Sequence, residues 1–245
     1  MSGRRARKER KFPEQSERAR GVILTAERML AVDFSDVPCD HTRQVIVGWM
    51  RHAFEQSRIV AQLQMAGLGH AAAPNWRSFF ETVGRLQWLD GVDHEDRLGA
   101  VDAMLKNDKD HVGKEVTNLR ALGYESDAKL EEMESVILEV TQSRPIAEQA
   151  RNFVEAAKAS PTATHGVYGA WRQETQYSHA TGVLGGAYAP NRGGFIGSGR
   201  PPQHDPDLDV HLGLMMLVTV MTGRLLEDEG VDRAKSLELF QTFLG

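Results

Sequence analysis

The sequence predicts an all-α protein, folded as a single-domain bundle of about eight or nine helices. Three observations predict this class. Apolar residues recur every three or four positions along most of the chain, no stretch alternates well enough to require a sheet, and Gly and Pro fall mainly between the periodic segments. With 245 residues, 41% of them hydrophobic, the chain is long enough to bury a substantial core.

The first thirteen residues predict a basic, disordered tail before a helical domain over 14–245. Residues 1–11 contain six Arg or Lys and one Glu, and no apolar run follows them as in a secretory signal. The whole chain has a net charge of −5, so the +5 of this segment leaves −10 for residues 12–245. Any affinity for nucleic acid must therefore come from the tail or from a local patch.

Three helices with amphipathic spacing are predicted in the first part of the domain. The first covers 14–32, and the segment around Pro38 ends it. The second covers about 41–65 and ends at Gly67, which suits a left-handed cap. The third covers 75–89 and carries several large aromatic and aliphatic residues on its period.

The next stretch predicts polar helices that face solvent. Residues 90–139 contain fourteen Asp or Glu against six Lys or Arg, with only a thin apolar seam. We expect one or two helices over 93–122, then one over 127–141. Pro145 opens a further helix to residue 159.

A helix over 161–181 and a long loop follow. Gly182 can stop the helix. Residues 185–206 then contain six Gly and four Pro, so we expect a loop before the penultimate helix, with a short hairpin over 194–199.

The two C-terminal helices close the predicted bundle. Asp205 and Pro206 have the character of an N-cap and a first helical residue. The helix over 207–228 is the most apolar in the chain, which is typical of a central core helix or a dimer seam. The last helix covers 232–243.

One polar constellation has spacing suited to chemistry on a phosphate. Arg172 and His179 lie seven residues apart, which is nearly two helical turns, so on one helix they share a face about 10 Å apart along the axis. Arg can hold phosphoryl oxygens and His can transfer a proton.

This R-x6-H spacing on a late helix of an all-helical domain resembles the HEPN superfamily. Active members of that superfamily are metal-independent ribonucleases that use the 2′-hydroxyl of the RNA, and their Arg–His pair meets its mate across a two-fold axis. The resemblance implies a homodimer acting on RNA, in bacterial stress or phage defence. Arg172 would then clamp the phosphate and His179 would act as acid and base.

A second resemblance covers about residues 40–228. Two motifs make the chain similar to a bacterial helical family of unknown function. They are R-x-x-x-E, at Arg51 and Glu55, and Y-S-H, at Tyr177, Ser178 and His179. The resemblance implies a shared polar cluster in which Arg51, Glu55 and His179 approach one another, and which supports the Arg–His pair.

Two other interpretations of these residues stay open. A buried Arg–Glu–His network can simply fix helix packing, as in a non-enzymatic interaction protein. Alternatively, the 185–206 loop folds over Tyr177, Trp171 and Tyr188 to form a small-molecule pocket.

The remaining patterns exclude several classes of site. No metal-binding motif or Gly-rich phosphate loop is present, so we expect neither a metal nor a cofactor. The acidic and histidine residues of the polar stretch are interpreted as a solvated face: His94, Asp96, Asp108, Asp110 and His111. The single cysteine, Cys39, and the lack of a long uninterrupted apolar run favour a cytoplasmic protein that does not enter a membrane.

Overall fold

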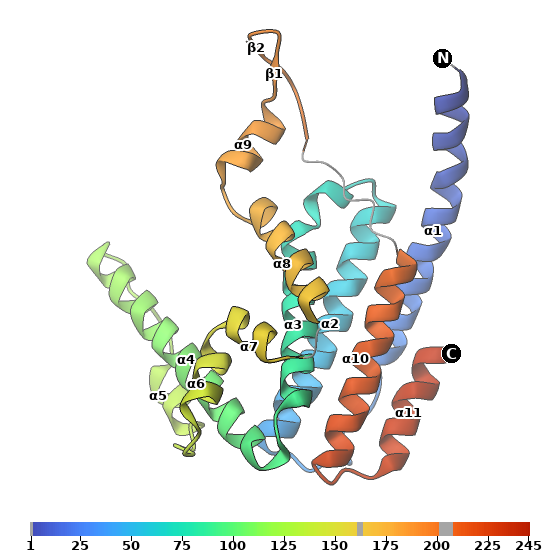
Figure 1. Ribbon diagram of the computed structural model, residues 1–245. Helices are drawn as coiled ribbons and strands as arrows, with labels where there is room; N and C mark the ends of the chain where they lie inside the picture. Colours follow the sequence, from blue (N-terminus) through green and yellow to red (C-terminus); the bar gives the residue numbers. More distant parts are fainter. Residues whose placement is uncertain (1, 161–163, 201–207) are drawn as a thin grey trace.

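The computed structural model describes residues 2–160, 164–200 and 208–245, with side chains for 16–160, 166–200 and 208–245. These residues form eleven α-helices, one 3-10 turn and one two-stranded hairpin (Figure 1). The all-α class is confirmed, and the helix count exceeds the predicted eight or nine. The structure has more helices because polar capping residues interrupt stretches that the periodicity alone predicts to be continuous helices.

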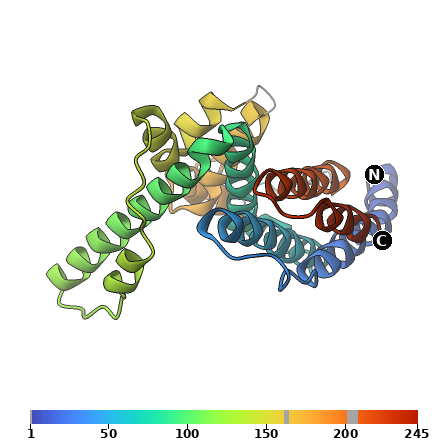
Figure 2. The same cartoon turned by 90° about the horizontal axis from the view of Figure 1, so that it is seen from below.

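Five helices build the main bundle. The second lies between the first and the third, the tenth packs on the second and third, and the eleventh packs on the tenth and the first (Figures 1 and 2). Their bounds are α1 Ser2–Leu30, α2 His41–Met65, α3 Ala73–Gly91, α10 Leu208–Asp228 and α11 Arg233–Leu244.

Local signals fix the ends of these helices. Asp40 caps α2 by accepting a hydrogen bond from the Arg43 amide at 2.8 Å. A 3-10 turn, η1 (Gly69–Ala71), connects α2 to α3. Helix α1 begins at Ser2 and not at residue 14, and the division at residue 13 into a disordered tail and a domain stays a prediction. The Asp205–Pro206 start predicted for α10 lies outside the described residues.

The core of the bundle is aromatic and aliphatic. Trp88, Phe54 and Phe79 are among its largest fully buried side chains, and α2, α3 and α10 each contribute a mainly apolar buried face. Burial of side chains of this size provides about 1.5–3 kcal/mol each, which is the main driving force for the bundle.

An arm leaves this bundle at the end of α3. Helix α4 (His94–Ala121) is continuous, and only its first turns are buried against the core (Figure 2). The fully buried Asp102 accepts hydrogen bonds from the Leu138 and Val140 amides at 2.7 and 3.0 Å, which ties the segment after α5 (Leu130–Ser135) to the arm.

The helix predicted over 145–159 is two helices. Asn152 ends α6 (Arg144–Arg151) and caps α7 (Phe153–Ala159) by accepting from the Val154 amide at 3.0 Å. Asn favours this cap because its short side chain competes with the helix for backbone groups. Helix α7 packs on α3.

Helix α8 (Thr164–Ser178) lies along α3, and the chain then projects from the body as α9 (Gly182–Tyr188) and a hairpin (Figure 1). Strands β1 (Asn191–Arg192) and β2 (Phe195–Ile196) pair antiparallel around two glycines with φ of 64° and 88°. The hairpin therefore begins three residues before the predicted position, and residues 201–207 of the predicted loop lie outside the described residues.

In the described part of the chain, one helix, α10, meets the length and hydropathy expected of a membrane span, and half of that stretch is buried inside the bundle.

Candidate functional site

The predicted Arg–His pair lies at the surface of α8. Arg172 is exposed on the helix, and His179 is exposed one residue beyond its end. Helix α8 ends early because Thr181 caps the next helix, accepting from the Leu184 amide at 3.2 Å. Within the described residues, neither side chain makes a hydrogen bond or ion pair, so both are accessible to a ligand and neither is held in place by a partner.

The predicted supporting residues have other partners. The Glu55 carboxylate binds the Arg58 guanidinium at 2.7 Å, and the Arg51 guanidinium lies 5.4 Å from the centre of the Phe34 ring. Over the ranges described, no ion pair joins Arg51 or Glu55 to His179. A cation one turn away on the same helix satisfies Glu55, so no inter-helical partner is required.

The other two residues of this set lie in the last turn of α8. Ser178 donates its hydroxyl hydrogen bond to the Glu174 carbonyl at 2.8 Å, within its own helix, and Tyr177 is half-buried. Their role beside Arg172 and His179 stays a prediction.

A different constellation lines a pocket of about 370 Å³ between α2, α3 and α4. Its polar groups come from all three helices and its floor is apolar. The polar lining is His52, Ser78, Glu81, Thr82, Arg85, Asn107 and Asp108; the apolar lining is Val45, Trp49, Val101, Met104, Leu105 and Ala150.

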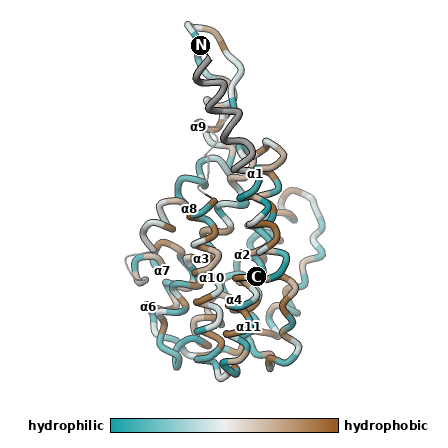
Figure 3. Tube along the Cα trace, turned by 90° about the vertical axis from the view of Figure 1, so that its right-hand side faces the viewer, coloured by the Kyte–Doolittle hydropathy of each residue, from teal (hydrophilic) through white to brown (hydrophobic). Residues whose placement is uncertain are grey.

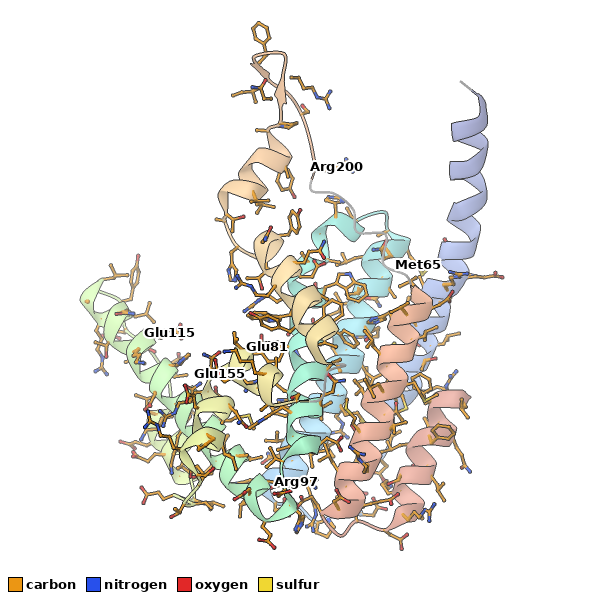
Figure 4. The ribbon with its side chains drawn as sticks, in the orientation of Figure 1. Met65, Glu81, Arg97, Glu115, Glu155 and Arg200 are labelled. Carbon is orange, nitrogen blue, oxygen red and sulfur yellow. The ribbon has the colours of Figure 1, made fainter. Side chains whose placement is uncertain are left out.

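Helical periodicity places these side chains together. On α3 the residues at positions 78, 81, 82 and 85 follow i, i+3, i+4, i+7 spacing, so they form one polar stripe on a mostly buried helix. In Figure 4, Glu81 lies on the side of α3 turned toward α4, α6 and α7. The same spacing recurs on the other two helices that line the pocket. The lining residues are at positions 45, 49 and 52 of α2 and at positions 101, 104, 105 and 108 of α4.

Arg85 is the cation of the pocket. Its Nη1 donates to the carbonyl oxygens of Gln149 and Ala150, both at 3.0 Å, at the C-terminal end of α6, where the helix dipole favours positive charge. Burial lowers the pKa of Arg85, and the nearby carboxylates of Glu81 and Asp108 partly offset this effect. The guanidinium also lies over the Phe153 and Trp88 rings, 5.6 and 5.9 Å from their centres. No carboxylate in the described part of the chain forms an ion pair with it, so Nε and Nη2 keep donors for another partner.

Two carboxylates lie near this guanidinium. Glu81 accepts a hydrogen bond from the Trp171 indole Nε1 at 3.0 Å. Partial burial raises the pKa of Asp108, and Arg85 and His111 oppose that shift. Asp108, at the open side of the pocket, is thus a carboxylate that a positive ligand group would stabilise.

His52 and Ser78 form a neutral polar pair at the rim. The His52 Nε2 lies 2.8 Å from the Ser78 Oγ, and partial burial lowers the pKa of His52, which favours its neutral form. A neutral imidazole and a hydroxyl can exchange hydrogen-bond roles with a ligand.

A second cavity, of about 660 Å³, lies against the first turns of α2 and α4, beside Cys39, His41 and Glu229. Next to it, the buried Arg97 binds Asp228 at 3.0 Å and Glu229 at 3.4 Å, and donates to the Val92 carbonyl (Figure 4). The cation there is saturated by the protein and joins the start of α4 to the end of α10. The described residues contain no group of three or more His, Cys, Asp or Glu that could hold a metal.

No family model matches this chain, and no curated protein or solved structure matches it. The two family resemblances therefore stay predictions, and the site must be judged by its own residues.

Sequence reasoning missed the pocket, although one signal was present. The polar stripe over 78–85 stands out on a helix of aromatic and aliphatic residues. Asp108 was interpreted as part of a solvated acidic face, and no role was predicted for His52. Only the convergence of α2, α3 and α4 brings these side chains together.

Proposed function

We propose that the protein binds a small polar molecule in the pocket between α2, α3 and α4. The observation that carries this proposal is the state of Arg85, whose side chain lines the pocket: two backbone carbonyls hold its Nη1, and within the described chain Nε and Nη2 have no hydrogen-bond or carboxylate partner. A desolvated cation with open donors is a binding group for an acceptor such as a carboxylate.

The carboxylates define the other end of the ligand. Glu81 and Asp108 are close enough to influence Arg85 electrostatically, and Asp108 has a raised pKa. An amine placed beside Asp108 would favour its charged form. The ligand class is therefore a small zwitterion, amino-acid-like in its charges, with an apolar part against Trp49 and Leu105.

A matched pair of variants on α4 tests the proposal. Small zwitterionic metabolites are screened for raising the melting temperature of the protein, and affinities are measured by calorimetry for wild type, Asp108→Asn and Asp110→Asn. Asp110 is exposed two residues away on the same helix, so its variant is a control for charge. We expect at least one ligand that binds wild type and Asp110→Asn alike and binds Asp108→Asn about tenfold or more weakly. Absence of any stabilising zwitterion, or equal binding to both variants, would overturn the proposal.

A second candidate is metal-independent RNA cleavage by a HEPN-like pair, in a bacterial cytoplasmic stress or phage-defence setting. The exposure of Arg172 and His179 favours it, because a catalytic pair must be reachable by substrate. We expect cleavage of single-stranded RNA to leave 2′,3′-cyclic phosphate ends and to fall at least about a hundredfold in His179→Ala. His94→Ala is the control, since the exposed His94 begins α4 beyond the C-terminal end of α3, whereas α8 ends beside the start of α3. Cleavage that persists in His179→Ala would exclude this activity.

A further inference from the structure

The outward face of α10 carries exposed hydrophobic residues beside Asp209, Gly213 and Arg224. Val210 and Val220 are exposed on it, and Leu214 and Leu217, which continue the i, i+4, i+7, i+10 spacing between them, are half-buried at the edge of the core. Val210 is 61% exposed and Val220 is 49% exposed. The sequence predicts that this helix is a core helix or a dimer seam. Within one chain, only part of its hydrophobic surface is buried.

Helix α11 extends this face. Leu237, Phe240 and Leu244 follow i, i+3, i+7 spacing and are 42 to 61% exposed. The Ser236 hydroxyl donates to the Gly223 carbonyl at 2.9 Å, so α11 lies directly against α10 and the two apolar stripes adjoin. Figure 3 shows the many hydrophobic residues of both helices from the side of α11.

We infer that this α10–α11 face binds a second copy of the chain. The two α10 helices would pack antiparallel about a two-fold axis at Leu217. The face is complementary to itself in this arrangement: Val210 and Arg224 each lie seven residues, or about 10 Å, from Leu217 on opposite sides. The two-fold axis therefore places the N-terminal end of one stripe against the C-terminal end of the other.

Charges at the two ends of the stripe support the antiparallel arrangement. Asp209 is exposed at the N-terminal end, where it pairs with Arg18, and Arg224 is exposed at the C-terminal end, where it pairs with Asp90. In the proposed dimer, Asp209 approaches the partner's Arg224. A parallel arrangement would instead bring like charges together at both ends. Since exposed ion pairs contribute little, they can extend to include the partner at small cost.

The size of the face sets the expected affinity. Helix α10 has 21 residues and α11 has 12, so they are about 31 and 18 Å long; with a width of about 10 Å each, the face covers roughly 500 Å² per copy. Specific interfaces bury about 800 Å² per partner. A dimer of moderate strength, which dissociates on dilution, is therefore expected.

Sedimentation equilibrium across the micromolar range tests the dimer. We expect wild type and Leu24→Glu to dimerise and Leu217→Glu to remain monomeric, with unchanged helical circular dichroism in all three. Leu24 is 56% exposed on α1, outside the face, and controls for a new surface charge. A wild-type monomer at all concentrations, or a Leu217→Glu dimer, would overturn the inference. A wild-type monomer that binds neutral or anionic lipid vesicles through this face would also overturn it, in favour of a membrane.

Crosslinking tests the orientation independently of stability. In a Cys39→Ser background, a short bis-maleimide should join Leu217→Cys copies to each other. It should also join Val210→Cys copies to Arg224→Cys copies in a mixture. Efficient crosslinking of Val210→Cys to itself would contradict the antiparallel two-fold arrangement.

Discussion

Two histidine environments in this molecule differ in a way that separates packing from binding. His211 on α10 is 2% exposed, its ring centre lies 4.6 Å from that of Trp76 and 4.4 Å from that of Phe79, and both ring nitrogens are buried without a hydrogen-bond partner. His52 is exposed at a pocket rim and bonds Ser78. His211 serves as an aromatic packing unit that must stay neutral. The polar groups around His52 remain accessible, so a ligand can replace or add to their partners.

The largest effect expected from this comparison is acid sensitivity caused by His211. Burial lowers its pKa from 6.5 to about 3. Below pH 6.5 the unfolded chain takes up a proton that the folded protein excludes until about pH 3, so the free energy of unfolding falls as the pH falls through this window. By pH 4.5 the loss is about 3 kcal/mol. Urea unfolding of His211→Leu at pH 7 and 4.5 should show most of this dependence removed, whereas His70→Leu should keep it.

Retention of the full acid dependence in His211→Leu would contradict this assignment. It would show that the ring nitrogens of His211 find partners in solution.

The second effect concerns Glu174 on α8, and here the free energy of unfolding falls as the pH rises. Burial raises the pKa of its carboxyl group from 4.5 to about 7. Its contribution to stability is fully present below pH 4.5 and is lost as the pH rises through 7, because the unfolded state then ionises more readily. We expect Glu174→Gln to stabilise the protein by about 2 kcal/mol at pH 8 and to have little effect at pH 5, as measured by chemical unfolding. Destabilisation at both values would show that the carboxylate has a partner.

The smallest stability effects are expected in the pocket. Ser78→Ala and Asp108→Asn should each change the free energy of unfolding by less than about 1 kcal/mol, because accessible polar groups contribute little to folding. Thermal unfolding checks this. A loss of several kcal/mol in either variant would mean that the pocket residues hold the helices together and that the distinction from the His211 region fails.

The sequence was sufficient to predict the parts of the fold in which each helix has its own amphipathic period. The predicted bounds 41–65 agree with α2, and 75–89 and 232–243 lie within two residues of α3 and α11. The helix predicted over 127–141 covers only Leu130–Ser135 in the structure. Two further errors came where a single polar side chain decides the outcome. Asn152 divides one predicted helix, and Thr181 caps a new one.

The candidate site was harder to predict, for a physical reason. Its residues come from α2, α3 and α4, and nothing local in the sequence states which faces of three helices converge. The pair Arg172 and His179 was found because both residues lie in one stretch. The stripe from Ser78 to Arg85 was visible in the same way, but the open donors of Arg85 depend on its contact with the end of α6.

The most direct test of the pocket compares two arginine side chains by nuclear magnetic resonance. The Nε–H signals of Arg85 and Arg97 are followed while a zwitterion that stabilises the protein is added. The Arg97 guanidinium is already bound to Asp228, Glu229 and the Val92 carbonyl, whereas Arg85 keeps donors open to the pocket. We expect the Arg85 signal to shift and its hydrogen exchange to slow while the Arg97 signal stays unchanged. A ligand that binds and leaves the Arg85 signal unaltered would contradict the account.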